Sequence, residues 1–152
     1  MVQRIEEYTT WIRDLLQEGD SNPNRRNKTL GIIEMLSTRI KCADMEMIIS
    51  VVYRPCKTSP RLFLEELLAE VQAQPTDVRK VIVWDFNMDQ LLKEYEEMVN
   101  RFVQQISMVQ KVTYSTHKPG GILDLVIDSE PSGSVDWMPT PFSDHFVYYN
   151  VH

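Results

Sequence analysis

Arg79-Lys80-Val81-Ile82-Val83-Trp84-Asp85-Phe86-Asn87 is the stretch of sequence that decides the fold. Its apolar run, Val81 to Trp84, shows no polar/apolar alternation and is rich in branched residues. This is typical of a short strand buried on both faces at the centre of an α/β sheet. Because side chains alternate along a strand, Asp85 and Asn87 are predicted to point the same way, at the carboxyl end where ligands bind in such folds. The stretch fits equally an Asp/Asn turn that closes a core strand.

Length and composition predict one soluble globular domain over residues 1–152, since 43% of the residues are hydrophobic and 25% are charged. No apolar run approaches the roughly 18 residues that span a bilayer, and charges interrupt the N-terminus at once, so we expect no membrane segment and no signal peptide. Cys42 and Cys56 form no disulfide framework, which favours free thiols and an intracellular location, cytoplasmic or nuclear. The net charge of −6 restricts any nucleic-acid binding to a local surface.

Hydrophobic periodicity predicts helices that alternate with strands. The expected helices cover residues 3–17, a segment that begins at Ser59-Pro60 and ends before Pro75, and residues 90–107. Residues 20–28 read as a polar loop whose cations either contact phosphate or stay solvated. Strands are expected over residues 30–42, 45–53, 81–84, 122–127 and 146–151, with a hairpin turn at 43–44, a strand or extended loop at 111–116 and a short extended segment at 135–137. This order predicts an α+β or α/β fold in which helices pack on one side of a mixed β-sheet.

Polar residues stand at three separate strands. Asp85 and Asn87 follow the central strand, Asp124 interrupts the apolar run at residues 122–127, and Asp144 and His145 open the last strand. A carboxylate buried inside an apolar strand needs a partner, so we expect Asp124 within hydrogen-bond reach of His145 at one edge of the sheet. Carboxylates and an amide without a Cys/His cluster suit Mg²⁺ or Mn²⁺ rather than zinc. These are the parts of metal-assisted phosphodiester hydrolysis.

Four short motifs resemble those of the endonuclease/exonuclease/phosphatase superfamily, in the same order and spacing. They are Tyr53-Arg54-Pro55, Trp84-Asp85-Phe86-Asn87, Thr116-His117 with Leu123-Asp124-Leu125-Val126, and Ser143-Asp144-His145. They are most similar to the apurinic-type endonuclease domain of non-LTR (LINE-like) retrotransposons. The resemblance runs from about Leu30 to the C-terminus and implies a truncated four-layer nuclease sandwich.

The resemblance also implies the role of each site residue in a Mg²⁺- or Mn²⁺-dependent endonuclease that acts on DNA. Asp85 would orient or deprotonate the attacking water, and Asn87 would hold that water or the scissile phosphate. Tyr53 would contact the phosphate. His145 would stabilise the charge of the transition state, and Asp124 would orient the His145 ring.

The sequence departs from the family pattern at two places. In the family, two further strands come first and carry an Asn and the principal metal-binding Glu. The divergent helix and loop at residues 1–28 contain no counterpart of these strands, so Asp85 and Asp144 remain as the metal ligands. Trp84 replaces the glycine that precedes the Asp in the family, and its indole would crowd the backbone at the substrate. Both departures predict weak Mg²⁺ binding and impaired hydrolysis.

Three functions stay open at this point. In the first, the chain is an active phosphodiesterase whose missing carboxylate comes from Glu6, Glu7 or a partner chain. In the second, it is a catalytically inactive nuclease-derived binding protein. In the third, it is a retrotransposon remnant that still folds. The absence of the first strands also predicts an exposed sheet edge. Such an edge would be covered by a second copy in a homodimer, by a partner protein or by the helix at residues 3–17.

Overall fold

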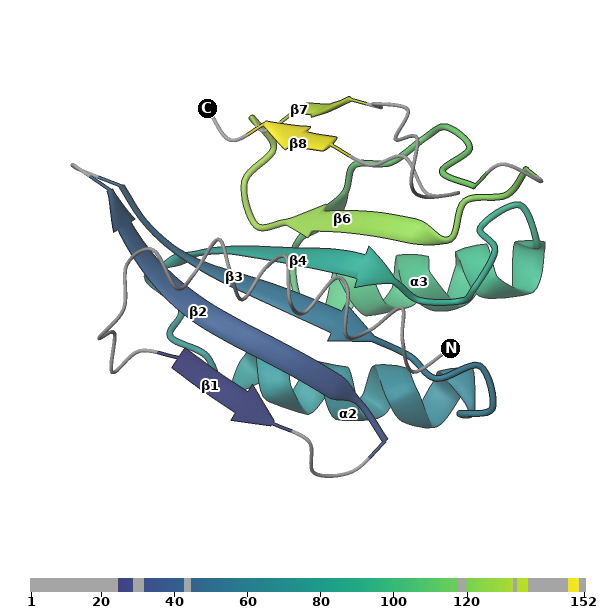
Figure 1. Cartoon of the computed structure of the whole chain (residues 1–152), viewed down its shortest axis with the longest axis horizontal. Coiled ribbons are helices and arrows are strands. Elements are labelled where there is room, and N and C mark those ends of the chain that lie inside the picture. Colours follow the sequence, from purple (N-terminus) through teal and green to yellow (C-terminus); the bar gives the residue numbers. More distant parts are fainter. Residues whose placement is uncertain are drawn as a thin grey trace.

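The computed structural model describes residues 25–28, 32–42, 45–117, 120–132, 134–136 and 148–150. Its main feature is a six-stranded sheet in the order β1-β2-β3-β4-β6-β5, beside a two-stranded ribbon of β7 and β8 (Figure 1). The strands are β1 (Arg25–Lys28), β2 (Glu34–Cys42), β3 (Met45–Tyr53), β4 (Arg79–Asp85), β5 (Val109–Gln110), β6 (Asp124–Asp128), β7 (Ser134–Asp136) and β8 (Tyr148–Asn150). Two helices, α2 (Pro60–Gln72) and α3 (Lys93–Gln105), pack on one face of the main sheet. The expected mixed sheet with helices on one side is confirmed.

The strands around β4 combine a hairpin with a crossover. β2 and β3 pair antiparallel up to Cys42 and Met45, as the hairpin prediction requires. β3 then connects through α2 to β4, which lies parallel to β3, and β6 lies antiparallel on the other side of β4. Ser59 is the N-cap of α2, and Pro60 is its first residue. Proline is well tolerated at this position, because the N–H that it lacks would have no acceptor within the helix. β4 is therefore the central strand that its unbroken apolar run predicts.

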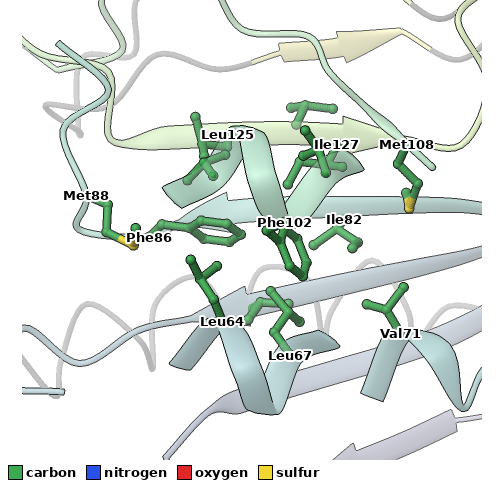
Figure 2. Close-up of a cluster of buried hydrophobic side chains, with 14 of the residues drawn as sticks. Leu64, Leu67, Val71, Ile82, Phe86, Met88, Phe102, Met108, Leu125 and Ile127 are labelled. Atoms are coloured by element: carbon green, nitrogen blue, oxygen red, sulfur yellow. The ribbon is translucent and has the colours of Figure 1, made fainter. Parts of the chain in front are cut away.

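The hydrophobic core lies between the two helices and the sheet face that they cover. Figure 2 shows Leu67 of α2, Phe102 of α3 and Ile82 of β4 in one cluster. Phe63 of α2 meets the ring of Phe86 edge to face, with the centroids 5.2 Å apart. Burial of each such side chain contributes about 1.5–3 kcal/mol. Phe86 thus anchors the segment directly after β4, which carries the candidate site.

Several predicted boundaries are wrong. Residues 25–28, predicted to be loop, form the edge strand β1, which pairs antiparallel with β2. β5 covers Val109–Gln110, earlier in the chain than the predicted extended segment at 111–116. β6 begins two residues later than predicted, at Asp124. α3 is shorter than predicted: it begins at Lys93, and the loop before it contains Gln90, which donates its N–H to the carbonyl of Ile122.

Other predictions concern residues that the structure does not describe. The helix at residues 3–17 and the first part of the polar loop at 20–28 lie outside the described residues, as do Asp144 and His145. β7 and β8 fall within or beside the extended segments predicted at 135–137 and 146–151. Neither helix of the described part is long and apolar enough to cross a membrane.

Candidate functional site

Three of the predicted site residues lie in one row across neighbouring strands. Tyr53 ends β3, Asp85 ends β4 and Asp124 begins β6. Asp85 and Asp124 are direct partners in the antiparallel register. The parallel register pairs Val51 with Val83, so two residues further on Tyr53 comes level with Asp85. Paired residues share a face of the sheet, so the three side chains are neighbours at the carboxyl end of β4, which is its right-hand end in Figure 1. Side chains alternate along a strand, and Ile82 of β4 and Leu125 of β6 lie in the core with the helices (Figure 2), so this row is on the opposite face of the sheet.

Two carboxylates oppose one another in this row. Directly opposite residues in an antiparallel pair have Cβ atoms about 4.5–5.5 Å apart, and like charges there are destabilising. Asp85 and Asp124 are both half-buried, and neither is without an interaction partner in the folded chain. Two carboxylates at opposed positions suit a site that receives a cation or a proton donor.

Asn87 joins this row through a tight turn rather than through the strand. β4 ends at Asp85, so strand alternation does not orient Asn87, and the predicted reason for its direction is wrong. Asn87 has a φ of 47°, in the left-handed region, and donates its backbone N–H to Oδ1 of Asp85 at 2.8 Å. Its side-chain Nδ2 donates to the carbonyl oxygen of Arg54 at 2.9 Å. The Asp/Asn turn that this stretch predicts is therefore present, and the ligand site at the same residues stays a prediction.

Arg54 has a place in the site that the sequence does not predict. Its guanidinium is buried and donates to the backbone carbonyls of Phe86, Asn87 and Thr58. It therefore holds the segment that follows Asp85. The only available signal was its place between Tyr53 and Pro55, because its partners lie up to 33 residues away in sequence.

Thr116 supports the start of β6 in a similar way. It is completely buried, and its hydroxyl oxygen accepts the N–H groups of Leu123 and Asp124, both at 3.1 Å. These bonds set the backbone at the first residue of β6. Thr116 belongs to one of the four sequence motifs, but the motif alone does not predict this structural role.

Asp89 attaches the loop after Asn87 to the segment before β6. Its Oδ1 accepts the N–H of Ile122 at 3.0 Å. Gly121 has a φ of 104°, and a Cβ at this position would lie 3.0 Å from Oδ2 of Asp89. Glycine is therefore required here for both backbone conformation and space.

The expectation that Asp124 is buried inside a strand is wrong. Asp124 begins β6 and is half-buried, whereas Asp128, which ends β6, has no exposed surface. Asp128 has its partner in Arg79, with Nη2 to Oδ2 at 2.7 Å and Nε to Oδ1 at 3.2 Å. The predicted bond between Asp124 and His145 involves a residue outside the described part and stays a prediction. The same holds for Asp144 as a metal ligand.

The donor chemistry of the row is that of a hard cation. Carboxylate and phenol oxygens, with the amide of Asn87 nearby, suit Mg²⁺ or Mn²⁺. The described residues contain no group of three or more His, Cys, Asp or Glu side chains that could hold a metal ion. Asp85 and Asp124 thus supply two carboxylates, and a metal site here requires further ligands from elsewhere.

Solved structures with this arrangement of strands and helices share the fold. They include the human Nocturnin catalytic domain (15% identity, TM-score 0.56, 86% of this chain and 58% of that one). A Leptotrichia buccalis endonuclease/exonuclease/phosphatase family protein matches at 15% identity with a TM-score of 0.57, over 77% and 53% of the two chains. Staphylococcus aureus beta toxin with bound magnesium ions matches at 13% identity with a TM-score of 0.57, over 74% and 55%. The chain shares the fold of these structures, one of which is an endonuclease/exonuclease/phosphatase family protein.

The likeness is one of structure, and it is partial. No family model matches the sequence, and no curated protein matches it either. The chain spans 53–58% of the length of the three structures named above. At 13–15% identity the comparison supports the fold, and the chemistry has to be argued from the residues.

Proposed function

We propose that this chain carries the water- and phosphate-handling part of a divalent-metal-dependent phosphodiesterase site of the nuclease type. The row of Tyr53, Asp85 and Asp124 across three strand ends is the observation that supports the proposal most. It places two carboxylates and a phenol at the end of the sheet where residues from different strands converge. The fold adds support, because a solved structure that shares it contains magnesium ions.

Each described residue has a chemical task in this proposal. Asp85 orients and deprotonates the attacking water, because its Oδ1 is fixed by the Asn87 N–H. Asn87 uses one of its two amide hydrogens on the Arg54 carbonyl, which leaves the amide a second hydrogen for a phosphate oxygen or the water. Tyr53 contacts the phosphate from the neighbouring strand.

The remaining tasks belong to residues that the structure does not describe and to a cation. We propose that His145 stabilises negative charge in the transition state, with Asp124 orienting its ring. Asp85 and Asp144 are the proposed metal ligands. Bound Mg²⁺ or Mn²⁺ would polarise the phosphoryl oxygen and supply the positive charge that the facing carboxylates favour.

We further propose a relationship to the endonuclease domains of non-LTR retrotransposons, with DNA as the substrate. The support is the sequence, since the four motifs occur together and in order. Because the described carboxylates are few for Mg²⁺, we expect weak metal binding and slow cleavage by the isolated chain. Misplacement of the phosphate by about 1 Å can lower the rate roughly a hundredfold.

The test combines metal binding with DNA cleavage. Addition of Mn²⁺ should broaden the amide resonances of Asp85 and Asp124, and Asp85→Ala should weaken this effect. Supercoiled and abasic DNA should be nicked slowly in Mg²⁺, and His145→Ala should abolish the nicking. If metal neither broadens these resonances nor supports cleavage, the phosphodiesterase proposal is wrong. If cleavage is efficient, a missing ligand is supplied, and Glu6 and Glu7 are the first to substitute.

A second candidate function is binding without catalysis. It is favoured by the small number of carboxylates gathered among the described residues. In this case a DNA duplex or a partner protein would bind at the same strand ends in the absence of metal. Gel-shift measurements in EDTA distinguish the two functions, because binding without any metal-dependent nicking supports the second.

A further inference from the structure

Arg54 lies buried at the junction of β3 and the turn after β4, with only 3% of its surface exposed. Its Nε donates to the carbonyl oxygen of Phe86 at 2.6 Å. Nη1 donates to the carbonyl of Thr58 and Nη2 to that of Asn87, both at 2.5 Å. All three nitrogens of the guanidinium are thus bonded to backbone. A planar fork with donors in fixed directions suits this task, and a lysine could reach only part of it.

Arg54 and Asn87 of the candidate site are joined by hydrogen bonds in both directions. Arg54 donates to Asn87 through Nη2, and Asn87 returns a bond from Nδ2 to the Arg54 carbonyl at 2.9 Å. Asn87 in turn donates its N–H to Asp85. A left-handed conformation at a residue other than glycine persists only when its surroundings hold it, and these bonds do so. Release of Arg54 would therefore free both the Asn87 amide and the Asp85 carboxylate.

The charge of Arg54 is also used differently from that of Arg79, which is buried as well. Arg79 is neutralised by Asp128 at 2.7 Å and lies 3.6 Å from Glu130. Arg54 makes no salt bridge with a carboxylate among the described residues, and its bonds are to carbonyl dipoles. A buried cation without a carboxylate partner is unfavourable for stability. It adds positive potential beside Asp85, where the proposed phosphate would bind.

We infer that Arg54 is a positioning residue of the candidate site, which acts through Asp85 and Asn87 and does not itself touch the reacting atoms. This inference rests on the proposed function for its effect on catalysis. The structural part of it, that Arg54 holds Asn87 in its left-handed turn, stands independently.

The experiment compares Arg54→Lys with Arg79→Lys. Both variants keep the charge and replace a buried arginine, but Arg79 lies at the opposite end of β4. The three-bond HN–Hα coupling and the amide exchange rate of Asn87 report on the turn, and Mn²⁺ broadening at Asp85 reports on the site. We expect both variants to lose stability, and only Arg54→Lys to change the coupling, speed the exchange at least tenfold and weaken the Mn²⁺ effect. Cleavage by Arg54→Lys should fall roughly a hundredfold in kcat with little change in KM.

The two parts of the inference fail separately. If Arg54→Lys does not fold, Arg54→Gln, which keeps an amide donor without the charge, is measured in the same way. Equal changes at Asn87 in the Arg54 and Arg79 variants would overturn the positioning role. If wild-type chain shows neither Mn²⁺ broadening nor cleavage, the proposed function fails, and the Asn87 coupling alone decides whether Arg54 holds the turn.

Discussion

The two ends of β4 differ in the charges that they bring next to β6. At the amino end, Arg79 meets Asp128 in a buried pair with two bonds. At the carboxyl end, Asp85 directly faces Asp124, so two acids oppose each other in the same ladder. One pair of strands therefore carries a buried ion pair at one end and two directly paired acids at the other. The candidate site lies at the end with the two acids.

The largest effect is expected at the ion-paired end. Asp128→Ala leaves the Arg79 guanidinium buried without its main partner, which should lower the free energy of unfolding by about 3–5 kcal/mol. Urea denaturation followed by tryptophan fluorescence measures this loss. The double variant Arg79→Met with Asp128→Leu should lose much less, because it leaves no buried charge. Equal losses in the single and double variants would show that the pair is not what stabilises this end.

An intermediate effect is expected where β6 begins. Thr116→Val leaves the N–H groups of Leu123 and Asp124 without their acceptor and should cost about 1–3 kcal/mol of stability. Thr116→Ser keeps the oxygen and is the control. Faster amide exchange at Leu123 and Asp124 in Thr116→Val alone is the expected local signature. Unchanged exchange at both amides would contradict the supporting role of this hydroxyl.

The smallest effect is expected at the end where acids oppose. Asp85→Asn removes one of the facing charges and keeps an oxygen for the Asn87 N–H, so stability should stay constant or rise by up to about 1 kcal/mol. The gain should shrink as salt screens the pair. Urea denaturation at low and high ionic strength measures both effects. Asp128→Asn is the matched control and should destabilise, so a similar loss for Asp85→Asn would contradict the contrast between the two ends.

Much of the fold follows from the sequence because its signals are local. The unbroken apolar run at β4, the Ser59-Pro60 start of α2 and the hairpin between β2 and β3 depend on neighbouring residues, and the structure agrees with each. The boundaries that failed depend on distant partners. Residues 25–28 become a strand only because β2 offers them an edge, and the loop before α3 is bonded to Ile122, which lies 32 residues after Gln90.

The candidate site divides in the same way. The sequence by itself determined that Tyr53 and Asp85 stand where apolar strands end, whereas it predicted Asp124 inside a strand and not at its start. Only the tertiary structure decided that Asp128 rather than Asp124 is the buried acid, and that Arg54 holds the turn at Asn87. The reason is physical: burial and hydrogen-bond partners depend on strand register and on contacts between residues more than 30 positions apart, which no local pattern encodes.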